Sequence, residues 1–131
     1  MTAPAINELV DAMVGKPFVW GARGPDSYYC LGIFLDLLER TRGIRLPGPF
    51  GVEDEEKLRR FFERFLALPK GFDVQPLDLF FWRWGSDAHV AIVESDRWTV
   101  SVSPEAGVHR ARVDDARARA ETLYRLKELV A

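Results

Sequence analysis

The sequence predicts an α+β fold in which helices come first and an antiparallel sheet follows. Apolar residues recur at intervals of three and four in three stretches of the first half of the chain. Four short β-prone runs, separated by polar turns, follow in the second half. Because helices and strands are segregated rather than alternating, we expect the antiparallel sheet to pack against a buried helix.

Three helices are expected in the first half. The first covers residues 5–14 and ends at Gly15, which is a suitable stop signal. The central helix begins at Cys30 and continues to about Arg40, and its apolar stripe is wide enough to require burial. A third helix is expected over residues 53–67, with acidic residues early and arginines late, as the helix dipole prefers.

The expected strands form a meander over residues 77–84, 88–94, 98–103 and 107–113. After them comes a charged, alanine-rich stretch over residues 114–121. The last apolar run, residues 123–130, is compatible with either a strand or a helix. We therefore leave the end of the chain open.

The composition limits the possible functions. The chain has 131 residues, which suits a single domain over residues 1–131. Its 18 basic and 20 acidic residues are interleaved, so no basic stripe favours a nucleic-acid partner. No apolar run approaches the roughly 20 residues needed for membrane insertion. The first residues lack a signal peptide pattern, so we expect synthesis in the cytoplasm.

A single cysteine allows neither an internal disulfide nor a multi-cysteine zinc site, and we expect no metal or cofactor. Cys30 stands at the predicted N-terminus of the central helix, where amide groups and the helix dipole favour a thiolate. The opposite interpretation is a small buried residue that packs in the core. Position alone does not separate a nucleophile from a packed cysteine.

His89 is the candidate base. It lies in an alternating strand, with Ala91 and Val93 on its face and Val90 and Ile92 on the other. A hairpin centred on Ser95 would place Ser101 directly opposite His89, where its hydroxyl could fix the imidazole tautomer. The alternatives are a structural histidine and a surface serine. A slipped register would instead make His109 or a backbone carbonyl the orienting group.

The order of motifs resembles the NlpC-type cell-wall cysteine peptidases. The nucleophile region matches in Pro17-Phe18-Val19-Trp20-Gly21 and then in Asp26, Tyr28, Cys30 and Gly32. Further matches are Gly43-Ile44, Leu46-Pro47, Pro76-Leu77-Asp78-Leu79-Phe80-Phe81 and His89-Val90-Ala91-Ile92-Val93. The resemblance covers roughly residues 5–113. The Cys-Leu-Gly variant looks most like members encoded with bacteriophage tail proteins.

This resemblance implies a papain-like fold and hydrolysis of γ-D-glutamyl to diamino-acid amides in peptidoglycan stem peptides. It makes Cys30 the nucleophile, His89 the base and Ser101 the third catalytic residue. Phe18 and Cys30 fall in the oxyanion region, where Phe18 replaces a tyrosine and removes one donor. Trp20 and Tyr29 would line the substrate groove, Tyr29 replacing an aspartate. The implied partners are a peptidoglycan stem peptide and phage tail proteins, with location in a virion.

Two other functional classes remain open at this point. The chain could be a wall-binding or tail structural module whose catalytic residues have partly eroded. It could also be an acyltransferase or amidase acting on another amide or ester, because a fold does not determine the reaction.

Overall fold

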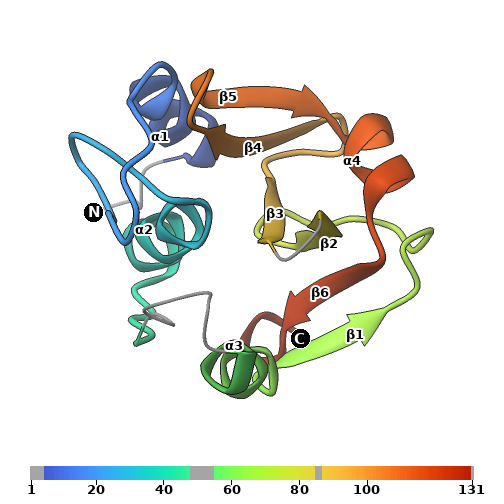
Figure 1. Ribbon diagram of the computed structural model, residues 1–131. Helices are drawn as coiled ribbons and strands as arrows, with labels where there is room; N and C mark the ends of the chain where they lie inside the picture. The colour runs from blue at the N-terminus through green and yellow to red at the C-terminus, as the bar shows by residue number, and fades with distance from the viewer. Residues whose placement is uncertain (1–4, 48–54, 85–86, 131) are drawn as a thin grey trace.

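The computed structural model describes residues 5–47, 55–84 and 87–130. The helices are α1 (Ile6–Met13), α2 (Cys30–Arg42), α3 (Glu55–Phe62) and α4 (Val113–Arg119), with a short 3₁₀ turn, η1 (Lys127–Leu129), near the end. The strands are β1 (Phe65–Leu68), β2 (Leu79–Trp84), β3 (Asp87–Val93), β4 (Trp98–Ser103), β5 (Gly107–Arg112) and β6 (Thr122–Leu126). They form one antiparallel sheet in the order β1-β6-β2-β3-β4-β5 (Figure 1). The predicted α+β class is confirmed.

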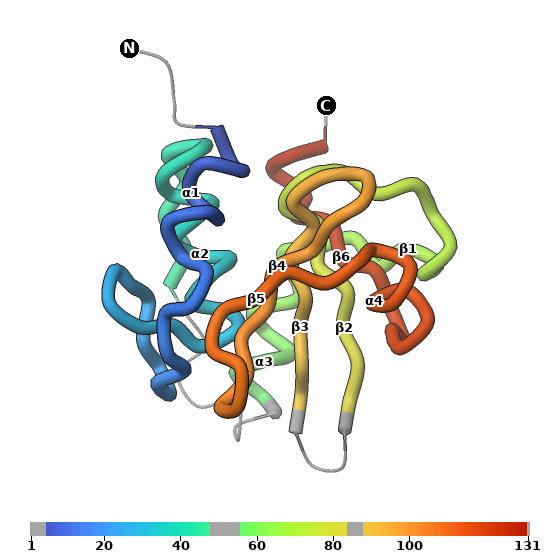
Figure 2. The backbone as a smooth tube through the Cα atoms, turned by 90° about the horizontal axis from the view of Figure 1, so that it is seen from above, coloured from blue at the N-terminus to red at the C-terminus, as the bar shows by residue number. Residues whose placement is uncertain are grey.

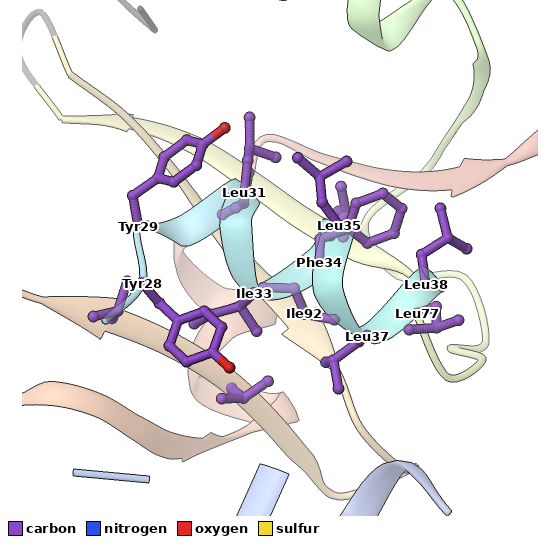
Figure 3. Close-up of a cluster of buried hydrophobic side chains, with 14 of the residues drawn as sticks. Tyr28, Tyr29, Leu31, Ile33, Phe34, Leu35, Leu37, Leu38, Leu77 and Ile92 are labelled. Carbon is purple, nitrogen blue, oxygen red and sulfur yellow. The ribbon is translucent and has the colours of Figure 1, made fainter. Parts of the chain in front are cut away.

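The central helix α2 is buried, as its sequence predicted. It ends at Gly43, whose φ of 69° is the left-handed conformation that glycine adopts at helix ends. Seven of its residues are buried, and Figure 3 shows how the larger side chains project around it. The buried residues are Leu31, Gly32, Ile33, Phe34, Leu35, Leu37 and Leu38.

The two faces of the β2–β3 pair carry different cores. Val90 and Ile92 pack in the large cluster that includes the α2 side chains. Ala91 and Val93 pack in a smaller cluster with residues of α4. Figure 1 shows α2 and α4 on opposite sides of this strand pair. The alternation predicted for the strand of His89 is therefore confirmed.

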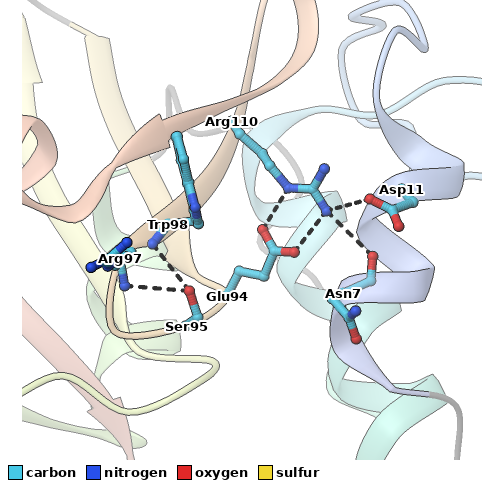
Figure 4. Close-up of polar contacts among 7 residues, drawn as sticks. All are labelled: Asn7, Asp11, Glu94, Ser95, Arg97, Trp98 and Arg110. Atoms are coloured by element: carbon cyan, nitrogen blue, oxygen red, sulfur yellow. Dashed lines mark hydrogen bonds and ion pairs between the residues drawn. The ribbon is translucent and has the colours of Figure 1, made fainter.

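The helical layer is attached to the sheet through Arg110 on β5. Its guanidinium donates two hydrogen bonds to Glu94, at 2.7 and 2.8 Å, and one to Asp11 of α1 at 2.7 Å (Figure 4). Just after α1, the backbone of Gly15 and Lys16 pairs with that of Val108. Seen from above, α1 and α2 therefore lie together at one side of the sheet (Figure 2).

The third helix is shorter than predicted. It ends at Phe62 and the chain enters β1, so the expectation of helix through residue 67 is wrong. The cause is tertiary: residues 65–68 find partners along β6, and sheet pairing overrides the helical spacing of the phenylalanines. The last apolar run divides into β6 and the 3₁₀ turn. The expected start of the third helix at residues 53–54 and part of the loop after α2 lie outside the described residues.

A helix long and apolar enough to cross a membrane is not found in the described part of the chain.

Candidate active site

Cys30 occupies the first position of α2, and the preceding loop holds it there. The Tyr29 N–H donates to the Ala22 carbonyl at 2.9 Å. That carbonyl lies so close to Gly32 that any side chain at position 32 would collide with it. Glycine in the first turn of α2 therefore lets the loop pack against the helix, which places Cys30 at the junction of helix, loop and sheet.

The sulfur of Cys30 is surrounded by backbone donors. The amides of Leu31, Val90 and Cys30 itself donate to it, and each lowers the thiol pKa. Cys30 keeps some surface exposure, yet burial of the thiol acts in the opposite direction and is the largest effect, so the pKa rises from 9.0 to about 11. The three amide donors act in the direction expected for a helix N-terminus, but loss of solvation outweighs them.

The amide of Val90 is available because β4 separates from β3. Val93 exchanges backbone hydrogen bonds with Leu77 and Asp78, on the β2 side. Successive residues of a strand direct their backbone groups to opposite edges, so Val90 faces the β4 side. Among the described strands, the β3–β4 ladder consists of Ile92–Val100 and Val93–Thr99. Cys30 thus contacts β3 along the β4 side, beyond the end of the β3–β4 ladder.

His89 is the residue next to Val90, but its side chain belongs to the face turned toward α4. Its ring stacks on Trp82, the residue paired with it on β2, with ring centroids 5.9 Å apart and planes 13° apart. Trp82 packs against the small core cluster on that face. The structure therefore brings Cys30 to the backbone beside His89, while the imidazole rests on the indole.

Ser101 is not opposite His89 in this register. The hairpin is centred on Asp96 instead of Ser95, because the Ser95 hydroxyl accepts the N–H groups of Arg97 and Trp98 and closes a tighter turn (Figure 4). The predicted direct pairing is wrong by two residues. A shift of two positions keeps Ser101 on the same face of the sheet as His89.

The hydroxyl of Ser101 instead meets His109 on β5. The Ser101 Oγ lies 3.3 Å from His109 Nε2, and His109 Nδ1 lies 2.9 Å from the Gly107 carbonyl oxygen. Because a carbonyl only accepts, Nδ1 carries a proton, and in the neutral ring Nε2 accepts from Ser101. His109 is half-buried.

Three aromatic rings lie next to the nucleophile position. Trp20 is 51% exposed and packs against Phe18 and Tyr29, with ring centroids 5.9 and 6.0 Å away. Phe18 is partly buried against the large core cluster, and Tyr29 is 2% exposed. Trp20 is thus the exposed member of this group.

The described residues give less support to a metal site or to a second site away from Cys30. Among them, no three His, Cys, Asp or Glu side chains are grouped so that they could hold a metal ion. A cavity of about 300 Å³ lies between the β3–β4 turn and the start of α4. Its lining consists of Asp96, Arg97, Arg112, Val113 and Asp114, and none of these is a predicted site residue.

Sequence reasoning missed the contributions of Val90 and Trp82. Val90 acts through a backbone amide, which leaves no signature in the side-chain sequence. Trp82 could have been found, because pairing the two predicted strands through a short turn places it beside His89.

Comparisons with known proteins identify the fold. No protein-family model matches the sequence, and no curated protein matches it by sequence. Solved structures do match, and three of them have TM-scores of 0.64–0.68 and identities of 19–20%.

They are the NlpC/p60 domain of the peptidoglycan hydrolase SagA, NlpC2 from Trichomonas vaginalis, and a lipoprotein-like NLP/P60-family protein from Staphylococcus aureus. The matches cover 96%, 93% and 93% of this chain, and 100%, 44% and 40% of the three proteins respectively. The chain therefore spans less than half of the second and third proteins. With the helix-borne Cys30 set against β3, this chain has the fold of the NlpC/p60 domains.

Proposed function

We propose that this chain is a cysteine peptidase that hydrolyses amide bonds in cell-wall peptides, with Cys30 as the nucleophile. The observation that carries the proposal is the position of the Cys30 sulfur. It lies at the start of α2, receives the Val90 amide, and is therefore one residue along β3 from His89. Fold similarity to the domain of a peptidoglycan hydrolase supports the choice of substrate.

The reaction must begin from a protonated thiol, since the pKa of Cys30 is about 11 in this state. His89 accepts the thiol proton as sulfur adds to the amide carbonyl, forming a C–S bond and an oxyanion. When the C–N bond breaks, His89 returns the proton to the leaving amine. Water then cleaves the thioester and releases the acid.

For this step the imidazole of His89 must reach the sulfur of Cys30. The backbone of Val90 faces the β4 side of β3, beyond the point where the described β3–β4 ladder ends. Catalytic contacts are often long before substrate binds, so the stacking of His89 on Trp82 is compatible with this role.

The finer proposal is that the scissile bond is the γ-D-glutamyl to diamino-acid amide of peptidoglycan stem peptides. Its support is the motif resemblance around Cys30 and His89. The Cys-Leu-Gly variant of the nucleophile motif likewise supports association with a bacteriophage tail. Mass spectrometry of purified virions would detect the chain there; its absence from virions would refute this association.

A second candidate function is binding of wall peptides without cleavage. Two observations favour it: burial raises the pKa of Cys30 to about 11, and Phe18 lacks a hydroxyl. In this case the three neighbouring rings of Phe18, Trp20 and Tyr29 would bind the peptide. Binding and cleavage are separated by turnover, because a binding module retains the peptide unchanged.

The test is hydrolysis of an L-alanyl-γ-D-glutamyl-diamino acid peptide, followed by chromatography. We expect release of the diamino acid by the wild type and loss of at least 10²-fold in rate in His89→Ala, consistent with removal of a general base. Cys30→Ala should be inactive. A matched α-L-glutamyl peptide should resist cleavage. Binding without turnover by the wild type would favour the second candidate, and equal activity in Cys30→Ala would exclude Cys30 as the nucleophile.

A further inference from the structure

We propose that the Tyr29 hydroxyl is a hydrogen-bond donor to the substrate oxygen that becomes negatively charged when Cys30 attacks a carbonyl. The proposal rests on the proposed cysteine peptidase function and adds a substrate-contacting residue to it. It makes position 29 the source of a donor that Phe18 cannot provide.

The first observation is an unpartnered polar group. Tyr29 is 2% exposed, and its hydroxyl oxygen is buried without a hydrogen-bond partner among the described residues. Burying a hydroxyl without a partner destabilises a protein, so such groups are uncommon and call for an explanation. Its neighbour Tyr28 is equally buried, but the Tyr28 hydroxyl donates to Asp36 at 3.0 Å.

The second observation is the position of the Tyr29 side chain at the start of α2. Tyr29 immediately precedes Cys30, and its ring lies over Gly32 in the first turn of α2. Figure 3 shows Tyr28 and Tyr29 projecting from the start of α2 in different directions. Of these two tyrosines, Tyr29 is the one whose hydroxyl has no partner among the described residues, and it directly precedes Cys30.

The charges around the Tyr29 hydroxyl suit a group that donates a hydrogen bond to a negatively charged oxygen. Burial is the main cause that raises the pKa of Tyr29 to about 12, and the charge of Cys30 contributes in the same direction. The phenol therefore stays protonated throughout the neutral range. Arg23 acts on the same hydroxyl with the opposite sign, so a positive charge is also within electrostatic reach.

The buried hydroxyl becomes accessible only if a neighbouring side chain moves, and Trp20 is an exposed ring in contact with Tyr29. Trp20 packs edge-on against the Tyr29 ring and is 51% exposed. An exposed indole can shift when an acyl group binds, without disturbing the core. Tyr29 then donates a hydrogen bond but does not transfer its proton.

The experiment measures acylation of Cys30 by p-nitrophenyl acetate, a probe that does not depend on peptide recognition. The Cys30 thiol gives its proton to His89 as the sulfur adds to the ester carbonyl, the C–O bond breaks, and p-nitrophenolate leaves while a thioester forms. The burst of p-nitrophenolate is compared in the wild type, Tyr29→Phe and Tyr28→Phe. Urea unfolding of each variant is followed in parallel.

We expect Tyr29→Phe to slow acylation about 10²-fold, the usual effect of removing one oxyanion donor, without lowering the urea midpoint. Tyr28→Phe should do the reverse, because it removes the hydrogen bond from Tyr28 to Asp36 but touches no substrate. Acylation of Tyr29→Phe at the wild-type rate would overturn the proposal. So would a lowered urea midpoint in Tyr29→Phe, which would show that the hydroxyl already has a partner such as water.

The same measurement separates this inference from the proposed function. A wild-type protein that gives no burst, with no thioester on Cys30, would overturn both. A normal burst that is insensitive to Tyr29→Phe would overturn the inference alone.

Discussion

The sulfur of Cys30 accepts the backbone N–H of Val90, although the two residues are 60 positions apart in the chain. This contact fixes the N-terminus of α2 against the edge of β3. The described β3–β4 ladder ends at the Ile92–Val100 pair, which leaves the amide of Val90 without a ladder partner on β4. One backbone donor thus links the helix, the sheet and the candidate nucleophile.

The first prediction concerns the reactivity of Cys30. Iodoacetamide reacts with thiolates, and burial raises the pKa of this thiol from 9.0 to about 11. We expect alkylation at pH 7 to be about 10²-fold slower in the folded chain than in the urea-unfolded chain, because the thiolate fraction falls tenfold per pKa unit. The folded rate should rise with pH until about pH 11. A plateau below pH 9 would contradict the burial argument.

The second prediction concerns the missing hydroxyl at position 18. Phe18→Tyr should raise turnover of a stem peptide by up to about 10²-fold, since it adds a donor to the oxyanion region. Alkylation of Cys30 should hardly change. The gain should be larger in a Tyr29→Phe background than in the wild type if both phenols serve the same oxygen. Unchanged turnover in both backgrounds would place Phe18 outside the oxyanion region.

The third prediction separates the two histidines. These are the two histidines of the sequence, so their imidazole ¹⁵N signals are readily assigned. Ser101→Ala should change the Nε2 signal of His109, which loses its partner at 3.3 Å. The Nδ1–H tautomer should persist, because the Gly107 carbonyl remains. A change in His89 larger than that in His109 would instead assign Ser101 the orienting role that the sequence suggested.

The fourth prediction concerns stability. Arg125 on β6 donates two hydrogen bonds to Asp78, at 2.8 and 3.0 Å, and both side chains are at most 10% exposed. Asp78→Ala should lower the free energy of unfolding by about 3–5 kcal/mol, because it leaves a buried guanidinium without its counterion.

The matched control is Glu56→Ala, which removes the exposed ion pairs of Glu56 with Arg59 and Arg60. Its effect should stay below about 1 kcal/mol. Equal losses in the two variants, measured by urea unfolding, would show that burial of the Asp78–Arg125 pair has no energetic consequence.

The sequence was most informative where one face of an element is buried. The wide stripe after Cys30 and the alternation around His89 depend only on local spacing, and both were predicted correctly. The end of α3 could not be predicted, because residues 65–68 have helical spacing but find a sheet partner in β6. Long-range pairing of this kind is invisible to a local pattern.

The candidate site, too, was predictable only where it depends on local spacing. The position of Cys30 follows from the helix start, whereas its pKa depends on how many neighbours exclude water, which no local pattern reveals. The hairpin register depended on one hydroxyl, that of Ser95, whose two hydrogen bonds move the turn centre by one residue. That single displacement shifts the partners of the following strand by two.

The most direct test of the central claim is the intact mass of the protein after acid quenching during turnover of a γ-D-glutamyl stem peptide. If Cys30 is the nucleophile, the wild type should carry the mass of the acyl fragment as a thioester on Cys30, and hydroxylamine should remove it. His89→Ala should accumulate less of this adduct, because thiol deprotonation is impaired. A wild-type protein that cleaves the peptide without a Cys30 adduct, or carries the adduct at another residue, would contradict the account.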